Sequence, residues 1–545
     1  MRLLEKGGFS SAPWLRTAVF LLVILGMVAA IRLRLLDVPL ERDEGEFAYA
    51  AQLLDQGLSP YAGAYTVMLK LPGTFVSYAG CMALFGQTPA GIHLGVLLIN
   101  AATTVLVFLL GRRISGAGGG LAAAATFALL SIIPVTLGLA AHATHFVMLP
   151  AVAGILLIQK LDEQTPLRRI FAAGLLLGVA FWMKQTGALF GCFAAVWIWR
   201  CELGFGQRSW RRLGGRLACL AAGGALPILL TMLVIGLAGE FHRFWFWAFV
   251  YAWAHGSVLG WQAGLHVMFA NLLQQFKAAP AWWSLALAGF IPLFFHPFWR
   301  PWRFFLGSLA LCSFLAVCPG WYFRGHYFIQ LLPVAGLLAG VTYRAAGDWL
   351  AKLKLPAGSA SLPAIVFTVA VASSLVQWND VFFRLTPVEV CRSIYGPNPF
   401  PEAVRVADYL KSHCAPDARI AVLGSEPEIF FYAHRRSATG HICVYPLVEQ
   451  QPYAAAMRSE MIQEITAARP EYAVLVRVPP SWVQTSAPMD PSLLKWFHQY
   501  ARDQFQLVEL VEIWGDHPSD FRPITDPQAA VNTTTPFWLA IYRRN

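Results

Sequence analysis

Acidic and basic side chains that could do chemistry occur in this chain within unusually apolar surroundings. Asp43 and Glu44 lie within an acidic run, Glu41-Arg-Asp-Glu-Gly-Glu46, at the start of a helical pattern. The basic or titratable residues in comparable surroundings are Lys70, His142, His145, Lys184, Arg324 and His326. Charged groups at membrane depth cost about 2.5–3.5 kcal/mol each on insertion scales, so they normally face a cavity and pair there. The pattern therefore predicts one acid–base site, provided that the fold brings these residues together.

The composition places the site in a membrane protein that crosses the bilayer many times. The chain has 545 residues, 57% hydrophobic and only 13% charged, whereas a soluble chain is about 25% charged. This excludes an ordinary soluble, disordered, collagen-like or disulfide-scaffold protein. The net charge is +11, but the basic residues occur as scattered pairs. Such pairs are typical of membrane topology signals and argue against a nucleic-acid partner.

Apolar runs and basic clusters together predict the topology. Eleven spans are expected, near 17–36, 89–111, 118–139, 144–159, 170–183, 186–200, 217–239, 281–297, 304–319, 327–343 and 362–378. The basic clusters are Arg2, Lys6 and Arg16; Arg112-Arg113; Lys160 with Arg168-Arg169; Arg208, Arg211-Arg212 and Arg216; Arg300 and Arg303; and Arg344, Lys352 and Lys354. The positive-inside rule places all of them in the cytoplasm. The N-terminus is then inside, and the chain after residue 379 is outside.

Two ambiguous stretches are assigned by the number of crossings that keeps every basic cluster on the cytoplasmic side. Residues 71–86 are apolar, but a full span there would put Arg112-Arg113 on the wrong side, so we expect a juxtamembrane or re-entrant helix. Residues 169–200 hold Lys184 at their centre, and parity predicts two short spans with Lys184 at the outer turn. The membrane domain is expected over residues 1–379, with an outer loop at 37–88.

Residues 380–545 predict a second, extracytoplasmic α/β domain. Helical patterns at 401–412, 453–468 and 492–504 alternate with strand-like runs at 419–423, 472–477, 507–513 and 537–542. Three cysteines lie here, Cys391, Cys414 and Cys443, and one pair of them could form a disulfide.

Plainer explanations exist for each candidate. Acids in a first helical turn complement the helix dipole, and Lys70 could extend to lipid head groups. Lys184 could be a lysine of an interfacial turn. Arg324 and His326 could belong to an interfacial belt with the neighbouring aromatic residues. His142 and His145 are three residues apart and are weak candidates for a metal site, because two histidines do not complete one. A divalent metal is thus possible, and no cofactor is certain.

Four motifs give the chain a resemblance to the dolichyl-phosphate-mannose–protein mannosyltransferase superfamily of C-type-fold membrane glycosyltransferases, including bacterial families 39 and 83. DEGEFAYAAQLLDQG (43–57), followed by YAGAYTVMLKLPGTF (61–75), resembles the first outer loop of that superfamily. LLLGVAFWMKQTGALF (175–190) resembles its Gly-x-x-x-Lys-Gln turn, and RGHYFIQLLPVAGLLAG (324–340) its His-Tyr-Phe segment. RIAVLGSEPEIFFYAHRRSATG (419–440) is similar to the outer-domain strand and helix of bacterial members.

The resemblance implies a function and residue roles. The donor would be a polyprenyl-phosphate-linked sugar bound from the outer leaflet, and the acceptor a lipid, glycan or protein. Asp43 would be the general base and Glu44 would assist or orient it. Lys70, Lys184, Arg324 and His326, with Tyr327, would bind the donor phosphate, and transfer would invert the anomeric centre. The expected location is the bacterial plasma membrane.

The sequence departs from the superfamily at two points and leaves rival functions open. His142-Ala-Thr-His145 stands where members often have an acid, and Lys70-Leu-Pro72 replaces Lys-Pro-Pro. The first puts a carboxylate metal ligand in doubt. A transporter or flippase with an outer cap domain is the alternative, although the chain lacks the internal repeat typical of transporters. A scaffold without activity would make no demand on Asp43.

Overall fold

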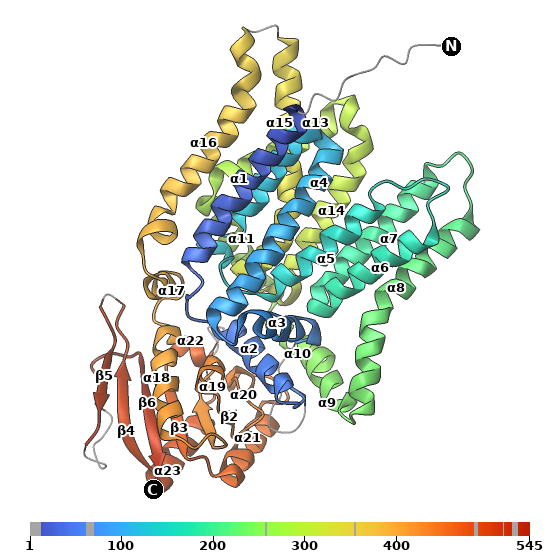
Figure 1. The fold of residues 1–545 in the computed structure, drawn as a ribbon. Coiled ribbons are helices and arrows are strands. Elements are labelled where there is room, and N and C mark those ends of the chain that lie inside the picture. The colour runs from blue at the N-terminus through green and yellow to red at the C-terminus, as the bar shows by residue number, and fades with distance from the viewer. Residues whose placement is uncertain are drawn as a thin grey trace, which may run out of the picture.

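A helical bundle and an α/β unit lie end to end, with a layer of short helices between them (Figure 1). The structure is a computed structural model that describes residues 12–61, 70–256, 259–353, 356–483, 489–515, 517–525 and 532–545. The fold class expected from the sequence, a polytopic helical protein with a C-terminal α/β part, is thereby confirmed. Arg2, Lys6, Lys354 and most of the run 61–75 lie outside the described residues.

The apolar runs of the first 379 residues form the bundle. Its helices are α1 (Ala12–Arg34), α4 (Pro89–Leu130), α5 (Ala143–Ile158), α6 (Leu167–Met183), α7 (Ala188–Leu203), α8 (Trp210–Leu237), α11 (Trp261–Ala278), α12 (Pro280–Ala288), α13 (Phe290–Phe295), α14 (Arg300–Val317), α15 (Leu332–Lys352) and α16 (Leu362–Gln377). The layer beneath them contains α2 (Arg42–Asp55), α3 (Pro72–Phe85), α9 (Phe241–Trp245), the π-helix η3 (Phe246–Tyr251) and α10 (Ala252–Gly256). Residues 71–86 thus form a separate helix, α3, as expected.

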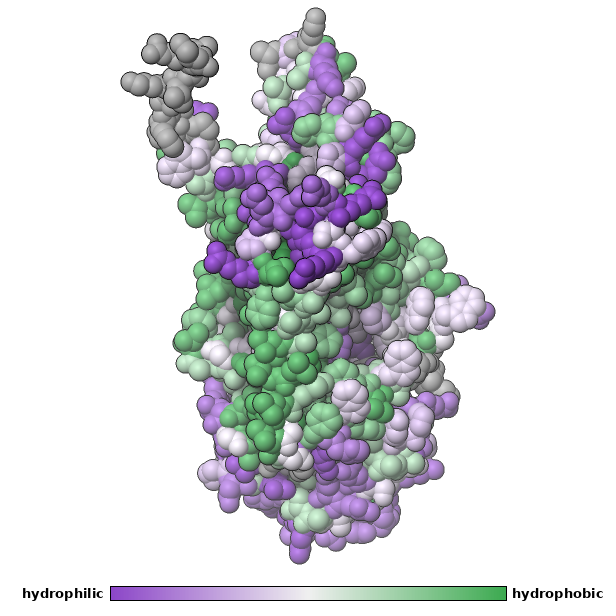
Figure 2. Space-filling model, turned by 90° about the vertical axis from the view of Figure 1, so that its right-hand side faces the viewer, coloured by the Kyte–Doolittle hydropathy of each residue, from purple (hydrophilic) through white to green (hydrophobic). Residues whose placement is uncertain are grey.

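Length and hydropathy identify fewer certain spans than the sequence predicted. Among the described residues, five helices are long and apolar enough to cross a membrane, or six if the pair Trp261–Ala278 and Pro280–Phe295, bent by 104°, counts as one. The other predicted spans fall on shorter helices, such as α5 with 16 residues. Eleven crossings therefore remain a prediction. On the face shown in Figure 2, a hydrophobic band nevertheless lies between two more hydrophilic ends.

Helix α4 is a hairpin that contains two of the predicted spans. Its backbone leaves the helical region at Gly116 (φ 75°, ψ −178°). The Nδ2 of Asn100 donates a hydrogen bond of 3.0 Å to the Oγ of Ser131, which lies 31 residues further along the chain. The two limbs therefore run antiparallel. The second limb ends at Leu130, earlier than the predicted 139, and Pro134 begins a separate short turn, η1 (Pro134–Thr136).

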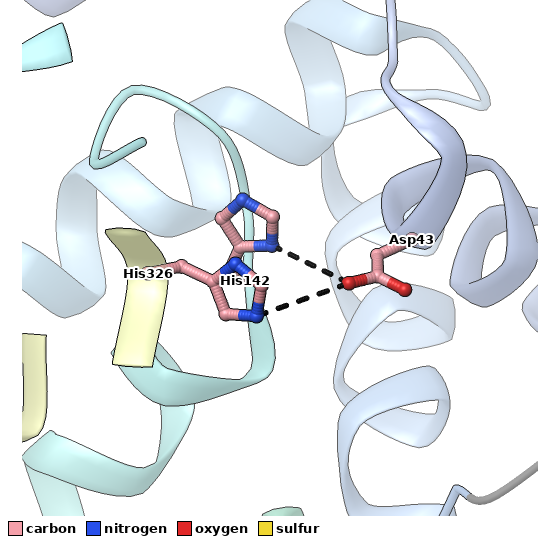
Figure 3. A group of neighbouring side chains, drawn as sticks. All are labelled: Asp43, His142 and His326. Carbon is pink, nitrogen blue, oxygen red and sulfur yellow. Dashed lines mark ion pairs between the residues drawn. The ribbon is translucent and has the colours of Figure 1, made fainter. Parts of the chain in front are cut away.

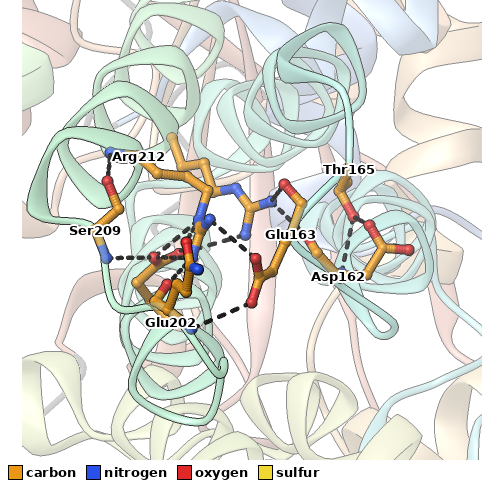
Figure 4. Close-up of polar contacts among 8 residues, drawn as sticks. Asp162, Glu163, Thr165, Glu202, Ser209 and Arg212 are labelled. Atoms are coloured by element: carbon orange, nitrogen blue, oxygen red, sulfur yellow. Dashed lines mark hydrogen bonds and ion pairs between the residues drawn. The ribbon is translucent and has the colours of Figure 1, made fainter.

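Basic residues of three predicted clusters lie close together, beside the C-terminal end of α5. Arg113 donates to the carbonyl of Leu156 at 2.9 Å, and Arg169 donates to that of Lys160 at 3.1 Å. In the same region Arg212 bridges Glu202 at 2.7 Å (Figure 4). The clusters thus share one end, as the topology requires. Their cytoplasmic orientation remains a prediction.

The α/β unit contains a six-stranded mixed sheet. The strands are β1 (Arg419–Leu423), β2 (Arg436–Ser437), β3 (Tyr472–Arg477), β4 (Phe505–Glu512), β5 (Asp520–Pro523) and β6 (Trp538–Arg544), in the order β2-β1-β3-β6-β4-β5. The three strands β2, β1 and β3 are parallel, and the remaining pairings are antiparallel. The helices are α17 (Pro387–Tyr395), α18 (Phe400–His413), α19 (Glu428–Ala433), α20 (Tyr445–Val448), α21 (Ala454–Ala468), α22 (Pro479–Trp482) and α23 (Ser492–Gln504).

The bundle and the α/β unit share a hydrophobic core around α2. Phe47 and Tyr49 of α2 belong to the same buried cluster as Phe430 of α19 and Val474 of β3. The outer loop 37–88 and the chain after 380 are therefore packed together, and the predicted domain boundary is not a gap between cores. No disulfide contributes to this packing, because all nine cysteines are free, including Cys391, Cys414 and Cys443. The pairing left open by the sequence does not form.

The hairpin at Gly116 gives a stability prediction. Its backbone angles lie in a region that is essentially reserved for glycine, while a Cβ there would meet only the Nη1 of Arg344 at 3.8 Å. We expect Gly116→Ala to destabilise the protein by about 1–3 kcal/mol through backbone strain, measured as a lowered Tm in detergent. Gly214→Ala in α8, where a Cβ meets nothing within 4 Å, should leave the Tm unchanged or raise it. Equal effects of the two variants would contradict the strain argument.

Candidate active site

The first turn of α2 is fixed by a capping box that also determines the position of Glu44. The Oε1 of Glu41 accepts from the backbone N–H of Glu44 at 3.0 Å, and the Oε2 of Glu44 accepts from that of Glu41 at 3.1 Å. The Oε1 of Glu44 also accepts from His93 Nε2 at 2.9 Å and from the backbone N–H of Ala141. Burial alone would raise the pKa of Glu44, but His93 and these hydrogen bonds lower it. Glu44 thus holds α2 against the bundle and does not line the cavity described next.

Asp43, one residue earlier, faces a cavity of about 250 Å³ between α2, the bundle and the α/β unit. We call it the main cavity. Its walls include Asp43 and all five residues predicted to bind a phosphate, namely Lys70, Lys184, Arg324, His326 and Tyr327. These residues come from four separate segments of the chain. The convergence that the sequence predicted therefore occurs in the structure.

Asp43 is surrounded by basic side chains. Its Oδ1 lies 2.9 Å from the Nζ of Lys70, and its Oδ2 lies 3.9 Å from the Nδ1 of His142 and 4.0 Å from the Nε2 of His326 (Figure 3). Burial by itself would raise the pKa of Asp43, but Lys70, followed by the two histidines, holds it well below its usual value. Asp43 is therefore an ionised carboxylate in the cavity wall.

Lys70 is positioned directly before α3 by its neighbours. Tyr61 Oη donates to the carbonyl of Lys70 at 2.9 Å, and Lys70 Nζ lies 3.4 Å from Glu46 Oε2 as well as beside Asp43. Its Nζ also lies 4.7 Å from the centre of the Phe47 ring. Two carboxylates keep the pKa of Lys70 above its usual value despite its burial. Lys70 is thus a fixed positive charge in the wall of the cavity.

Lys184 lies at the break between α6 and α7 and provides a second cation. Its backbone is extended (φ −157°, ψ 140°), as expected for a turn between two short helices. Its Nζ lies 4.0 Å from the centre of the Tyr327 ring. Thr186 donates to Gln330 Oε1 at 2.7 Å and so ties this turn to η6 (Gly325–Leu331). Burial and the proximity of Lys70 lower the pKa of Lys184 to about 7.

The two histidines named as weak candidates for a metal site, His142 and His145, are separated in the structure. His145 Nε2 bonds to the carbonyl of Gly138 at 2.9 Å and does not line the cavity. His142 instead stacks on His326, with ring centres 3.9 Å apart. Asp43, His142 and His326 have potential ligand atoms within 4.8 Å of one another. These three could hold a divalent cation, although Lys70 already occupies one oxygen of the carboxylate.

The α/β unit binds α2 through contacts next to Asp43. Arg42 is paired with the fully buried Glu426 at 2.9 Å and also donates to the carbonyl of Ser425. Further along α2, the Oη of Tyr49 accepts from the backbone N–H of Ser437 at 2.9 Å. A Cβ built on Gly45 would lie only 2.6 Å from the backbone nitrogen of Glu428, so the approach requires glycine. The α/β unit therefore positions the helix that carries Asp43.

Several residues of the main cavity were not among the predicted site residues. They are Glu46, His255, Tyr322, Tyr445 and Pro446. Glu46 belongs to the same acidic run as Asp43 and lies three residues after it on α2, so helical spacing could have indicated it. Tyr445 and Pro446 belong to α20 of the α/β unit, and no local pattern in the sequence connects them to α2. Only the tertiary packing brings them to the cavity.

Comparisons with known proteins define the class to which this fold belongs. Residues 72–235 match the family model described as dolichyl-phosphate-mannose-protein mannosyltransferase. ArnT from Cupriavidus metallidurans bound to undecaprenyl phosphate is similar over 88% of this chain and 97% of its own, with 18% identity and a TM-score of 0.56. The same protein in the apo state gives 16% identity, 98% of both chains and a TM-score of 0.57.

A third similar structure comes from another domain of life. The oligosaccharyltransferase AglB from Archaeoglobus fulgidus, in complex with an inhibitory peptide and a dolichol-phosphate, is 10% identical, with a TM-score of 0.51. The match covers 96% of this chain and 76% of that one. A search of curated protein sequences gives no significant match. The chain has the fold of the C-type membrane glycosyltransferases, and its resemblance to the mannosyltransferase superfamily is confirmed.

The buried ion pair between Arg42 and Glu426 gives a second stability prediction. We expect Arg42→Met to destabilise the protein by about 3–5 kcal/mol, because it leaves the buried Glu426 without its charged partner. The double variant Arg42→Met with Glu426→Gln should recover part of that loss, since no unpaired charge then remains. Thermal unfolding in detergent measures both. A double variant no more stable than Arg42→Met would show that the buried charge is not the cause.

Proposed function

We propose that this protein transfers a sugar from a polyprenyl-phosphate-linked donor to an acceptor at the outer face of a membrane. The single observation that supports this best is the main cavity, where the Asp43 carboxylate lies among basic side chains from separate segments. Such a site suits a reaction in which a hydroxyl or amine loses a proton while negative charge develops on a phosphate. The shared fold with proteins solved in complex with undecaprenyl phosphate and dolichol-phosphate agrees with this donor.

The basic residues would stabilise the leaving phosphate. As the bond between the anomeric carbon and the phosphate oxygen breaks, its electron pair stays on that oxygen, and a phosphodiester becomes a monoester with about one further negative charge. Lys70, Lys184 and Arg324 are the cations of the cavity wall, and His326 lies beside them. A single donor of this kind contributes about 3–4 kcal/mol to a transition state. Direct displacement by the acceptor would invert the anomeric centre.

Asp43 would act as general base, and donor binding would prepare it for that role. Lys70 pairs with Asp43 and lowers its basicity. A bound phosphate would attract Lys70 Nζ and weaken that pair, so the pKa of Asp43 would rise toward a value suited to proton transfer. Glu44 would then serve through the capping box, which holds the first turn of α2.

The location proposed for this chemistry is a bacterial plasma membrane. The N-terminus and the basic end of the bundle would lie in the cytoplasm, and the main cavity and the α/β unit would lie outside. The acceptor is a lipid, glycan or protein that reaches the cavity from that side. Polyprenyl-phosphate donors partition into the bilayer, which suits a cavity at the boundary between the bundle and the α/β unit.

Replacing the proposed base tests the function. We expect Asp43→Asn to lower the rate of sugar transfer from a short-chain polyprenyl-phosphate donor by about 10²–10⁴-fold, the usual contribution of a general base. Asp55→Asn is the matched control, because Asp55 lies exposed at the end of the same helix and bonds only to Gln87 in the described structure. Equal activity of wild type and Asp43→Asn would remove the base assignment. Solute flux without transfer from any donor would favour a transporter.

Lys184 gives a pH dependence that can be separated from the chemistry of Asp43. Because its pKa is about 7, Lys184 is charged below that pH and becomes neutral above it. A phosphate monoester has its second pKa near 6, so it stays doubly charged from pH 7 to 9. We expect affinity for polyprenyl phosphate to fall about tenfold over this range as the cation is lost. Lys184→Arg should remove most of this fall, since arginine stays charged. If the pH profile of Lys184→Arg equals that of wild type, Lys184 is not the cause of the fall in affinity.

A further inference from the structure

A second hollow lies beside the main cavity, where the α9–η3 segment meets helix α21. It has a volume of about 200 Å³ and is lined by His242, Arg243, Phe246, Trp247, Tyr453 and Glu460, together with Ala456 and Met457. We call it the outer cleft. We propose that the outer cleft binds a neutral saccharide portion of the acceptor, which makes the acceptor a glycan or glycolipid. This inference rests on the proposed sugar transfer.

The polar side chains of the outer cleft form a supported pair. Arg243 Nη2 lies 3.3 Å from Glu460 Oε1, and the two side chains are 40% and 46% exposed. An ion pair with this exposure adds little to stability. The other oxygen of Glu460 lies 3.2 Å from the Nε2 of His441, whose side chain is buried. Because His441 fixes the Glu460 carboxylate, its oxygens offer hydrogen-bonding positions to a ligand in a fixed orientation.

Aromatic rings form much of the remaining wall. The Phe246 ring meets Tyr453 at 5.1 Å and Trp247 at 5.3 Å, both nearly edge-on. Sugars combine an apolar C–H face with hydroxyl groups that both donate and accept hydrogen bonds. Aromatic rings beside an arginine and a carboxylate match both features. The outer cleft therefore has the chemistry of a saccharide site.

The charge balance of the outer cleft argues against an anionic ligand. Glu460 compensates Arg243 and would repel a phosphate, whereas the main cavity has Lys70, Lys184 and Arg324 to receive one. A lipid phosphate is thus expected in the main cavity, and an uncharged polar group in the outer cleft. The two hollows would divide donor and acceptor between them.

A row of ring contacts connects the outer cleft with the main cavity. Trp247 of the outer cleft contacts Tyr251 at 5.1 Å, and Tyr251 contacts His255 of the main cavity at 6.1 Å. All three residues belong to the continuous segment η3–α10. The same short segment therefore lines both hollows.

Saccharide binding can be measured without transfer. We would titrate the full-length protein in detergent with mannotriose, maltotriose and chitotriose by calorimetry. We expect wild type to bind at least one of them, and Glu460→Gln to weaken that binding by about tenfold through loss of a charged hydrogen-bond acceptor. Arg344→Gln is the control, because Arg344 forms a similar exposed pair with Asp348 at the opposite end of the bundle. Absence of binding by wild type to all three sugars, or equal binding by wild type and Glu460→Gln, would overturn the proposal.

Two further arms separate this inference from the proposed function. Asp43→Asn should bind the trisaccharide as wild type does, because Asp43 does not line the outer cleft. If Asp43→Asn transfers sugar normally, the base assignment fails while the binding result still decides the saccharide site. Glycerol phosphate tests whether the occupant is a phospholipid head group. Displacement of the trisaccharide from wild type by glycerol phosphate would overturn the assignment to a neutral sugar.

Discussion

The cost of burying most of the Asp43 carboxylate, whose side chain is 23% exposed, is the constraint on which the site depends. An isolated charge in such surroundings would become protonated. Lys70 at 2.9 Å from one oxygen keeps it ionised, and the rings of His142 and His326 lie 3.9 and 4.0 Å from the other oxygen. These partners come from the segment before α3, the start of α5 and η6. Contacts around one side chain thus tie together segments that are far apart in sequence.

The position of that carboxylate depends on both parts of the protein. On one side, Glu44 binds His93 and the backbone of Ala141, which fixes the first turn of α2 to the bundle. On the other side, Arg42 is paired with Glu426 of the α/β unit. Asp43 lies between these two neighbours in sequence, so a shift of either part moves it. The α/β unit therefore helps to position the candidate active site, and it shares a hydrophobic core with α2.

Much of the fold could be predicted because it depends on local patterns. The Lys184 turn, the separate helix at 71–86 and the strands at 419–423 and 472–477 follow from hydropathy, charge parity and β-branched runs. The edge strands β2 and β5 were missed because one has two residues and the other carries mixed charge. In the site, residue types and spacing found the cations but could not separate Asp43 from Glu44, or His142 from His145. Side-chain direction within one helical turn decides both cases, and only tertiary packing reveals it.

The outer cleft extends the same reasoning from one charge to a division between two sites. A cavity rich in cations favours a ligand whose negative charge increases during the reaction, and it would gain little from an uncharged acceptor. A compensated Arg243–Glu460 pair among aromatic rings has the opposite preference. Since segment 241–256 contributes to both hollows, a change in its packing would alter the distance between the two ligands. Because a misplacement of about 1 Å can lower a rate a hundredfold, this segment would set how the acceptor reaches the anomeric carbon, while the cations would determine where the phosphate lies.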